Sequence, residues 1–492
     1  MRTKTAIPLV FLLFAAPGSA GAQGVPLIPP GPHWSAAELR AAHGAYESGE
    51  LQILASLTTD QDPARKSSVV SLGPDYLSVS SESGQTIIDT KLKRLMQVDR
   101  KAKVFVNNSL YAPAAFVQQE LRNRLNLRGG MERAGVTAEK LPDNLKTFWI
   151  ESDLGAEAGE QGPPAFQRID HEDGSVSILF EGDVVAFWKL SKTELSFAQT
   201  DTFRLFLQYH LKLHPRVRRA ILAEKLLPER ITYKRFRGKT KVEEDYRFRV
   251  LQRRPAAYPL ARGLEPQIEA RAGDTFHREV YPVMAAAVVE SQDKGPLGFD
   301  AYLESARGAM GRGATFDAWL MLMEATLHHP QLSPFCGSTA EDHPGCFNQE
   351  TVQNVLLKDA RTRELQTALA LKQRANQPER MLERLRLISR DGLSKGYMLD
   401  VFSGNTLSQR PDLKEQFPQD PAALIAAGIR RNPYVPTFYK DLGDHFARNR
   451  DFARAFICYD LGRALPDGGR HQKLQQISQQ ERDLERLFPD FF

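Results

Sequence analysis

The chain has 492 residues, of which 42% are hydrophobic and 25% are charged, and its formal net charge is +5. This hydrophobic content is enough for compact cores, which excludes global disorder, and the length is typical of two or three domains. Its 3 cysteines are too few for a dense disulfide framework, and a charge this close to balance favours no particular class of partner.

Residues 1–22 have the three parts of a cleavable signal peptide. Arg2 and Lys4 form a positive start, residues 6–16 are apolar, and small residues occupy positions 20–22. The apolar run is shorter than the roughly 20 residues that span a bilayer, and a Pro-Gly pair ends it. We therefore expect cleavage after residue 22, which lowers the formal charge to about +3, and a soluble periplasmic or secreted protein that is not an integral membrane protein.

Between about residues 51 and 254, apolar residues alternate with polar ones over short runs, which is the period of β-strands. The clearest pair of strands covers residues 231–236 and 244–250, joined by a turn at 237–240. In the second of these strands the apolar residues share one face: Tyr246, Phe248 and Val250. We expect that face to lie in a core and the opposite face to contact solvent.

Helical spacing interrupts the strands in three places, residues 35–46, 112–125 and 200–227. The last of these is expected to form two helices broken at Pro215. Asp201 is expected to cap the first helix of this pair, and Pro228 to end the second.

After residue 255 the strand period disappears, and helical spacing with Pro and Gly punctuation continues to residue 492. Segments of about 12 to 16 residues are typical of helices in stacked hairpins. We therefore predict an α+β domain of residues 23–255, in which an antiparallel sheet carries packed helices, and an all-α helical-hairpin domain of residues 256–492.

One part of the helical region has the residue spacing of a tetratricopeptide repeat. Aromatic, small and apolar residues stand at the diagnostic positions of two antiparallel helices: Tyr439, Leu442, Gly443, Phe446, Ala455 and Tyr459. Over roughly 34 residues the chain therefore resembles this repeat. The resemblance implies that neighbouring hairpins complete the core and that one face binds a peptide or partner protein. An unrelated helical bundle is the alternative.

The N-terminal half is similar to LolA-type periplasmic carriers in its order of strands and helices and in its export signal. The resemblance implies a curved antiparallel sheet that wraps helices and leaves an apolar groove for a lipid. No diagnostic motif accompanies this order of elements.

Cys336 and Cys346 flank a short loop that contains Gly and Pro. An oxidising compartment favours a disulfide between them. Two free thiols stay open as an alternative, and so does a metal site with nearby histidines, although this spacing of cysteines is not that of a zinc site. Cys458 lies in an apolar helical pattern and is expected to be a buried thiol. We assign no metal ligand and no cofactor.

Between Arg204 and Arg254, 16 Lys or Arg residues and 5 acidic residues give a local excess of +11. The arginines of the predicted hairpin form a candidate site for an anionic ligand such as a lipid headgroup: Arg235, Arg237, Arg247 and Arg249. The alternative is a solvated surface that pairs with acidic residues elsewhere. We do not expect a nucleic-acid partner, because no nucleic-acid-binding motif accompanies the charge.

No nucleophile, zinc or dinucleotide motif withstands inspection, so we name no catalytic residue. The leading hypothesis is a protein of the cell envelope that binds or scaffolds a partner protein through its helical domain. The second is a carrier of a lipid or other hydrophobic ligand in the sheet domain. The third is an enzyme whose site is built from residues distant in sequence.

Residues 487–492, Leu-Phe-Pro-Asp-Phe-Phe, form an unusually aromatic segment. We expect it to pack back on the helix that precedes it. A docking peptide is the alternative.

Overall fold

The computed structural model describes residues 31–136, 166–180, 183–237, 240–268, 274–294, 298–337, 342–466 and 468–492. The predicted signal peptide, residues 1–22, lies outside the described residues. The chain divides into two compact units: a sheet unit of residues 32–268 together with residues 481–492, and a helical unit that contains residues 269–480. Among the described residues, no helix has both the length and the apolar character of a membrane span.

The sheet unit contains a 12-stranded sheet, so the predicted α+β class with an antiparallel sheet is confirmed. Its strands are β1 Gly49–Thr59, β2 Lys66–Leu72, β3 Tyr76–Ser80, β4 Gln85–Asp89, β5 Arg94–Asp99, β6 Val104–Ser109, β7 Phe166–Asp170, β8 Ser175–Phe180, β9 Asp183–Glu194, β10 Leu226–Arg237, β11 Thr240–Pro255 and β12 Glu265–Gln267. Their order is β12-β6-β5-β4-β3-β2-β1-β11-β10-β9-β8-β7. Every neighbouring pair is antiparallel except β12 with β6.

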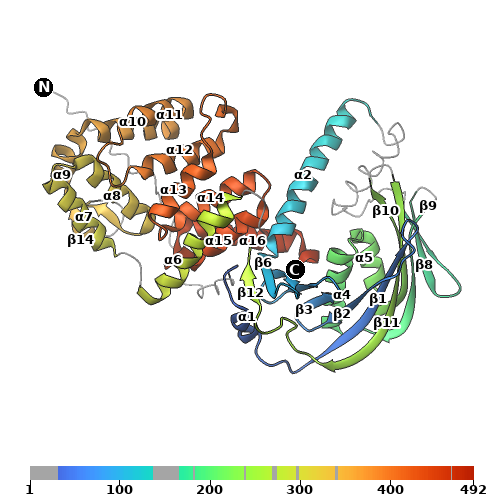
Figure 1. Ribbon diagram of the computed structural model, residues 1–492. Helices are drawn as coiled ribbons and strands as arrows, with labels where there is room; N and C mark the ends of the chain where they lie inside the picture. Colours follow the sequence, from blue (N-terminus) through green and yellow to red (C-terminus); the bar gives the residue numbers. More distant parts are fainter. Residues whose placement is uncertain are drawn as a thin grey trace. The chain divides into compact units, whose positions relative to one another are not determined.

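The sheet curves around helices that follow β9 in the chain (Figure 1). The described helical elements of the unit are α1 Ala36–His43, α2 Tyr111–Arg133, α4 Phe197–Leu205, the π-helix η3 Phe206–His210 and α5 Pro215–Leu222. Phe203 and Phe206 pack edge-on against Phe248 of β11, with ring centroids 6.1 and 6.0 Å apart. Helix and sheet therefore share an aromatic core on this face.

Two predicted helix ends in this region are wrong. Ser196 caps α4, because its hydroxyl accepts a hydrogen bond from the backbone N–H of Gln199. The Gln199 side-chain oxygen in turn accepts a hydrogen bond from the backbone N–H of Ser196. Asp201 instead lies inside the helix and pairs with Arg204 at 2.7 Å. The second helix, α5, ends at Leu222, and Pro228 lies in β10, whose ladder with β9 shifts register at that position.

The hairpin of β10 and β11 has the predicted alternation. Tyr246 and Phe248 are buried, whereas Arg247 and Arg249 are exposed. Val250 is 37% exposed, next to a register shift where β11 meets β1.

The helical unit consists mainly of paired helices, as predicted. Its elements are η4 Phe276–Val280, α6 Tyr281–Lys294, α7 Phe299–Gly311, α8 Thr315–His328, β13 Ser333–Phe335, β14 Asp342–Phe347, α9 Gln349–Asn354, η5 Leu356–Lys358, α10 Ala360–Ala375, α11 Pro378–Leu387, α12 Tyr397–Gln409, η6 Pro411–Leu413, α13 Pro421–Arg431, α14 Pro436–Arg448, α15 Phe452–Ala464 and η7 Gly468–Arg470. Helix α16, Gln472–Leu487, leads from this unit to the sheet unit, where η8, Pro489–Phe491, follows. The pairs α7/α8, α10/α11, α12/α13 and α14/α15 are the main helical hairpins described.

Glycines allow the helices of two successive hairpins to approach closely. A Cβ atom at Gly443 of α14 would lie 2.4 Å from the Tyr459 ring of α15, and one at Gly404 of α12 would lie 2.9 Å from Leu424 of α13. A Cβ at Gly428 of α13 would in turn contact Val401 of α12, and one at Gly462 of α15 would contact Tyr439 of α14. Gly428 and Gly462 stand 34 residues apart. The first-helix glycines, Gly404 and Gly443, stand 39 residues apart, so the two hairpins share close glycine packing without one exact period.

Cys336 and Cys346 form a disulfide, with Cα atoms 5.3 Å apart, so this predicted pair is confirmed. The disulfide lies at the short parallel strands β13 and β14. These strands are an exception to the prediction that residues 256–492 are all helical. Cys458 is a buried thiol in α15. Burial raises the pKa of the Cys458 thiol well above its usual value, which keeps it protonated and unreactive.

Replacing Gly443 with Ala forces the new methyl group into the Tyr459 ring, so we expect the free energy of unfolding to fall by about 1–3 kcal/mol. Gly311→Ala in α7 is the matched control, because no atom outside its chain neighbours and its own helix backbone lies within 4 Å of its added Cβ. The control should leave stability unchanged or raise it by less than about 1 kcal/mol. Denaturant unfolding of both variants measures the difference, and equal stability would contradict close packing at Gly443.

Candidate functional site

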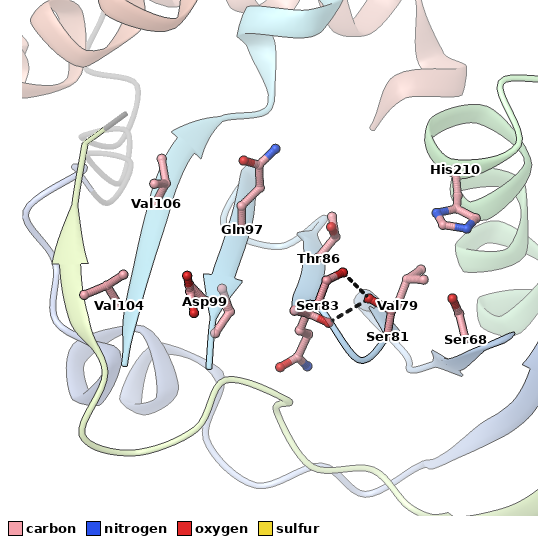
Figure 2. A pocket seen from close by; sticks show the side chains of 13 residues that line it. Ser68, Val79, Ser81, Ser83, Thr86, Gln97, Asp99, Val104, Val106 and His210 are labelled. Atoms are coloured by element: carbon pink, nitrogen blue, oxygen red, sulfur yellow. Dashed lines mark hydrogen bonds between the residues drawn. The ribbon is translucent and has the colours of Figure 1, made fainter. Parts of the chain in front are cut away.

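A pocket of about 360 Å³ lies in the sheet unit, between the sheet and the π-helix η3. Figure 2 shows its walls, which come from β2 to β6, from the β3–β4 turn and from His210 of η3. Both valines and hydroxyl-bearing side chains line the pocket. The described residues that line it are Ser68, Val79, Ser81, Ser83, Gly84, Gln85, Thr86, Gln97, Val98, Asp99, Val104, Val106 and His210.

Alternation of side chains along the strands explains why the pocket and the core next to α1 lie on opposite faces of the sheet. In β6, Phe105 is fully buried, whereas Val104 and Val106 are only half-buried and line the pocket. The buried side chains of β3 to β6 pack on the opposite face with α1 and with the segment that follows β11. Each of these strands therefore contributes one face to a core and the other to the pocket.

The polar side of the pocket is formed by short side chains and one imidazole. Ser81 and Ser83 are hydrogen-bonded to each other at 2.9 Å in the β3–β4 turn (Figure 2). The His210 ring stacks on Phe206, with centroids 5.1 Å apart. Loss of solvent lowers the pKa of His210, and the charge of Lys212 lowers it further, so the imidazole is neutral at pH 7.

The described lining contains no Lys or Arg, and Asp99 is its charged residue. Of the four candidate anion-binding arginines, Arg247 and Arg249 lie on the sheet face opposite Phe248, which packs against α4. The side chains of Arg235 and Arg237 lie outside the described residues. Arg247 lies 3.3 Å from the Asp245 carboxylate. The pocket thus offers hydroxyl, amide and apolar groups and no described cation.

A buried ionic cluster lies on the other face of the same strands. His43, at the end of α1, places Nδ1 3.1 Å from Asp75 and donates from Nε2 to Asp89 at 2.7 Å. Tyr46 donates to Asp75 and Tyr258 donates to Asp89, at 2.8 and 2.6 Å. Both ring nitrogens face carboxylates, so the doubly protonated imidazolium fits this site.

Burial alone lowers the pKa of His43, but the hydrogen bonds and charges of Asp75 and Asp89 raise it to about 9. The side chain of His43 is fully buried, and its ring stacks on Tyr258 at 4.0 Å. This cluster fixes α1 to the turns beside β3 and β4. Sequence reasoning missed it, because its members are far apart in the chain and no motif links them.

The helical unit contains a second buried charge. The fully buried Glu324 carboxylate of α8 lies 2.6 Å from the Lys395 ammonium and accepts hydrogen bonds from Tyr397 and, at 2.6 Å, from Asn432. Asn432 also donates to the Tyr302 hydroxyl at 2.9 Å. These residues come from α7, α8, α12 and the segments next to α12 and α13, so the network joins two hairpins, α7/α8 and α12/α13. Its carboxylate is neutralised and hydrogen-bonded, as a structural role requires.

The repeat-like positions in α14 and α15 lie together in the helical core. Tyr439 is fully buried, and Leu442, Phe446 and Ala455 are buried around it, with at most 7% exposure. Tyr459 donates a hydrogen bond to the Asp444 carboxylate at 2.9 Å. These positions form the inside of a hairpin and leave no room among themselves for a ligand.

No protein-family model matches the chain, and no curated protein sequence matches it.

The raised pKa of His43 predicts that the free energy of unfolding depends on pH. Because its folded-state pKa of about 9 is above the ordinary histidine value of 6.5 that applies in the unfolded chain, the stabilisation is complete below pH 6.5 and is lost as pH rises to 9. We expect the free energy of unfolding to fall by on the order of 3 kcal/mol over this window. His43→Gln should abolish most of this slope, whereas His171→Gln, at an exposed turn, should keep it. Denaturant titrations between pH 6 and 9.5 measure the slope, and the same slope in His43→Gln and the original protein would exclude this assignment.

Proposed function

We propose that the protein is an exported carrier that holds an amphipathic, lipid-like ligand in its sheet unit. The observation that carries the proposal is the pocket between the sheet and η3, whose walls combine valines with hydroxyl groups. Its volume of about 360 Å³ lies within the usual range for small-molecule sites. The valines suit an alkyl chain, and the serines and Thr86 suit a hydroxylated headgroup.

The architecture supports the same function. A curved antiparallel sheet around helices is the arrangement implied by the similarity to LolA-type carriers (Figure 1). The predicted signal peptide and the disulfide agree with an oxidising, extracytoplasmic location.

The chemistry of the lining favours a neutral or cationic headgroup over an anionic one. Asp99 is the charged residue among the described lining residues, and the neutral His210 supplies no positive charge at pH 7. An anionic headgroup would lose its hydration without a counter-charge, which is unfavourable. The exposed Arg247 and Arg249 lie on the opposite sheet face and do not compensate it.

Ligand binding is tested with a monoacylglycerol as the neutral probe and the fatty acid of equal chain length as the anionic one. We expect saturable binding of the monoacylglycerol, and binding at least about tenfold weaker for the fatty acid at pH 8. Val106→Lys should weaken monoacylglycerol binding by at least about tenfold, because a longer, charged side chain occupies the space beside the lining valines that suits an alkyl chain. Displacement of a fluorescent probe measures both affinities.

Val289→Lys is the control, since Val289 is 54% exposed in the helical unit. It should bind the monoacylglycerol as the original protein does. A ligand-free mass in native mass spectrometry of gently extracted protein, together with no saturable binding of either probe, would overturn the carrier function.

A second function, binding of a partner protein by the helical unit, is favoured by the packing of its hairpins. Two successive hairpins share close glycine contacts, and Gly428 and Gly462 of their second helices are 34 residues apart, which agrees with the tetratricopeptide resemblance. Leu387 at the end of α11 is 81% exposed and is an accessible position for a test.

Photo-crosslinking in intact cells tests this second function. A photoreactive amino acid at Leu387 is expected to give a discrete crosslinked product with one partner. The same residue at Phe197, which is 89% exposed at the start of α4 in the sheet unit, should not give that product. The same products from both positions, or none from Leu387, would count against partner binding by the helical unit.

A further inference from the structure

The aromatic segment, residues 488–492, is held by side chains of the sheet unit through its main chain. Arg204 of α4 donates to the carbonyls of Pro489 and Phe492 at 3.0 and 2.7 Å. Tyr209 of η3 donates from its hydroxyl to the Phe491 carbonyl at 3.0 Å. The segment was expected to pack on the helix that precedes it, and the structure adds that three of its main-chain oxygens are bound by α4 and η3.

A buried charge anchors the segment by one of its side chains. The Arg218 side chain of α5 is 4% exposed and donates to the Asp490 carboxylate at 2.7 Å. Its second amino group donates to the Leu213 carbonyl at 3.0 Å. A buried guanidinium needs a carboxylate partner, because leaving it unpaired is strongly destabilising. The α5 side of this surface therefore requires an acidic residue at the position of Asp490.

Aromatic rings complete the contact. The Phe491 ring lies edge-on to Tyr209, with centroids 5.7 Å apart, and the Phe492 ring lies 5.1 Å from that of Tyr111. Phe491 and Phe492 are only 7% and 9% exposed. Buried aromatic anchors, bound main-chain carbonyls and one buried ion pair are the features of a peptide-recognition site.

We infer that the surface of α4, η3 and α5 is a peptide-binding site for an acidic aromatic segment, which residues 488–492 fill in this chain and which an equivalent peptide in trans can replace. The ligand class is a short peptide with an aspartate between aromatic residues, bound by Arg218, Arg204 and Tyr209. The segment within the chain has the advantage of a high effective concentration, so exchange requires its release or an excess of peptide. This inference does not depend on the lipid-like ligand.

The test uses the full chain shortened after Leu487 and a fluorescent peptide with the sequence of residues 487–492. We expect saturable binding to the shortened protein, and binding at least about tenfold weaker to the full-length protein, whose site is filled. A peptide with Asp490→Asn should bind at least about tenfold more weakly, because it loses the charge-assisted bond to Arg218.

Two variants of the shortened protein distinguish specific binding at this site from nonspecific binding of an aromatic peptide. Arg218→Gln should lose the preference for the original peptide over the Asp490→Asn peptide, whereas Arg219→Gln, at the exposed neighbouring position, should keep it. A shortened protein that unfolds cooperatively but binds neither peptide, or binds both equally, overturns the inference.

The full-length protein gives an independent measurement if the shortened one does not fold. Excess peptide should free the native segment and accelerate chymotrypsin cleavage after Phe491, which is buried in the intact protein. The Asp490→Asn peptide should have little effect. Cleavage that neither peptide changes would also overturn the inference.

Discussion

The period-2 alternation of β-strands is the constraint on which the sheet unit depends. In β3 to β6, side chains such as Phe105 on one face enter the core with α1, and side chains such as Val106 on the other face line the pocket. A shift of one residue in the register would place Phe105 in the pocket and Val106 in the core. The pocket and the buried cluster around His43 are therefore two results of one alternation, and neither can move without the other.

Each unit contains buried charged side chains that are paired with oppositely charged side chains from distant parts of the chain. His43 has two carboxylates from neighbouring turns, Arg218 has Asp490, and Glu324 has Lys395. A buried ion pair adds little net stability compared with apolar packing, but removing one partner is costly. Such pairs therefore select one arrangement of the chain. They specify which turns, helices and segments meet, more than they add to the free energy of folding.

The sequence allowed the coarse fold to be predicted, because long strands and helices repeat their apolar residues at characteristic periods. The hairpin with Tyr246 and Phe248, the paired helices and the disulfide of Cys336 and Cys346 follow from such local signals. The ends of α4 and α5 did not follow, because Ser196 and Asp201 are both acceptable caps and only packing selects between them. The pocket could not be predicted either, since the side on which Val104 and Val106 lie depends on partners far away in the chain.

The placement of residues 481–492 in the sheet unit has a consequence for the order in which the chain folds. Arg218 and Asp490 are separated by 272 residues, and residues 269–480 of the helical unit lie between them in the sequence. Contacts between residues close in sequence form sooner than contacts at such a separation, so helical hairpins can form before Asp490 reaches Arg218. We therefore expect the sheet unit to reach its final packing after the helical hairpins, when the segment that follows them docks.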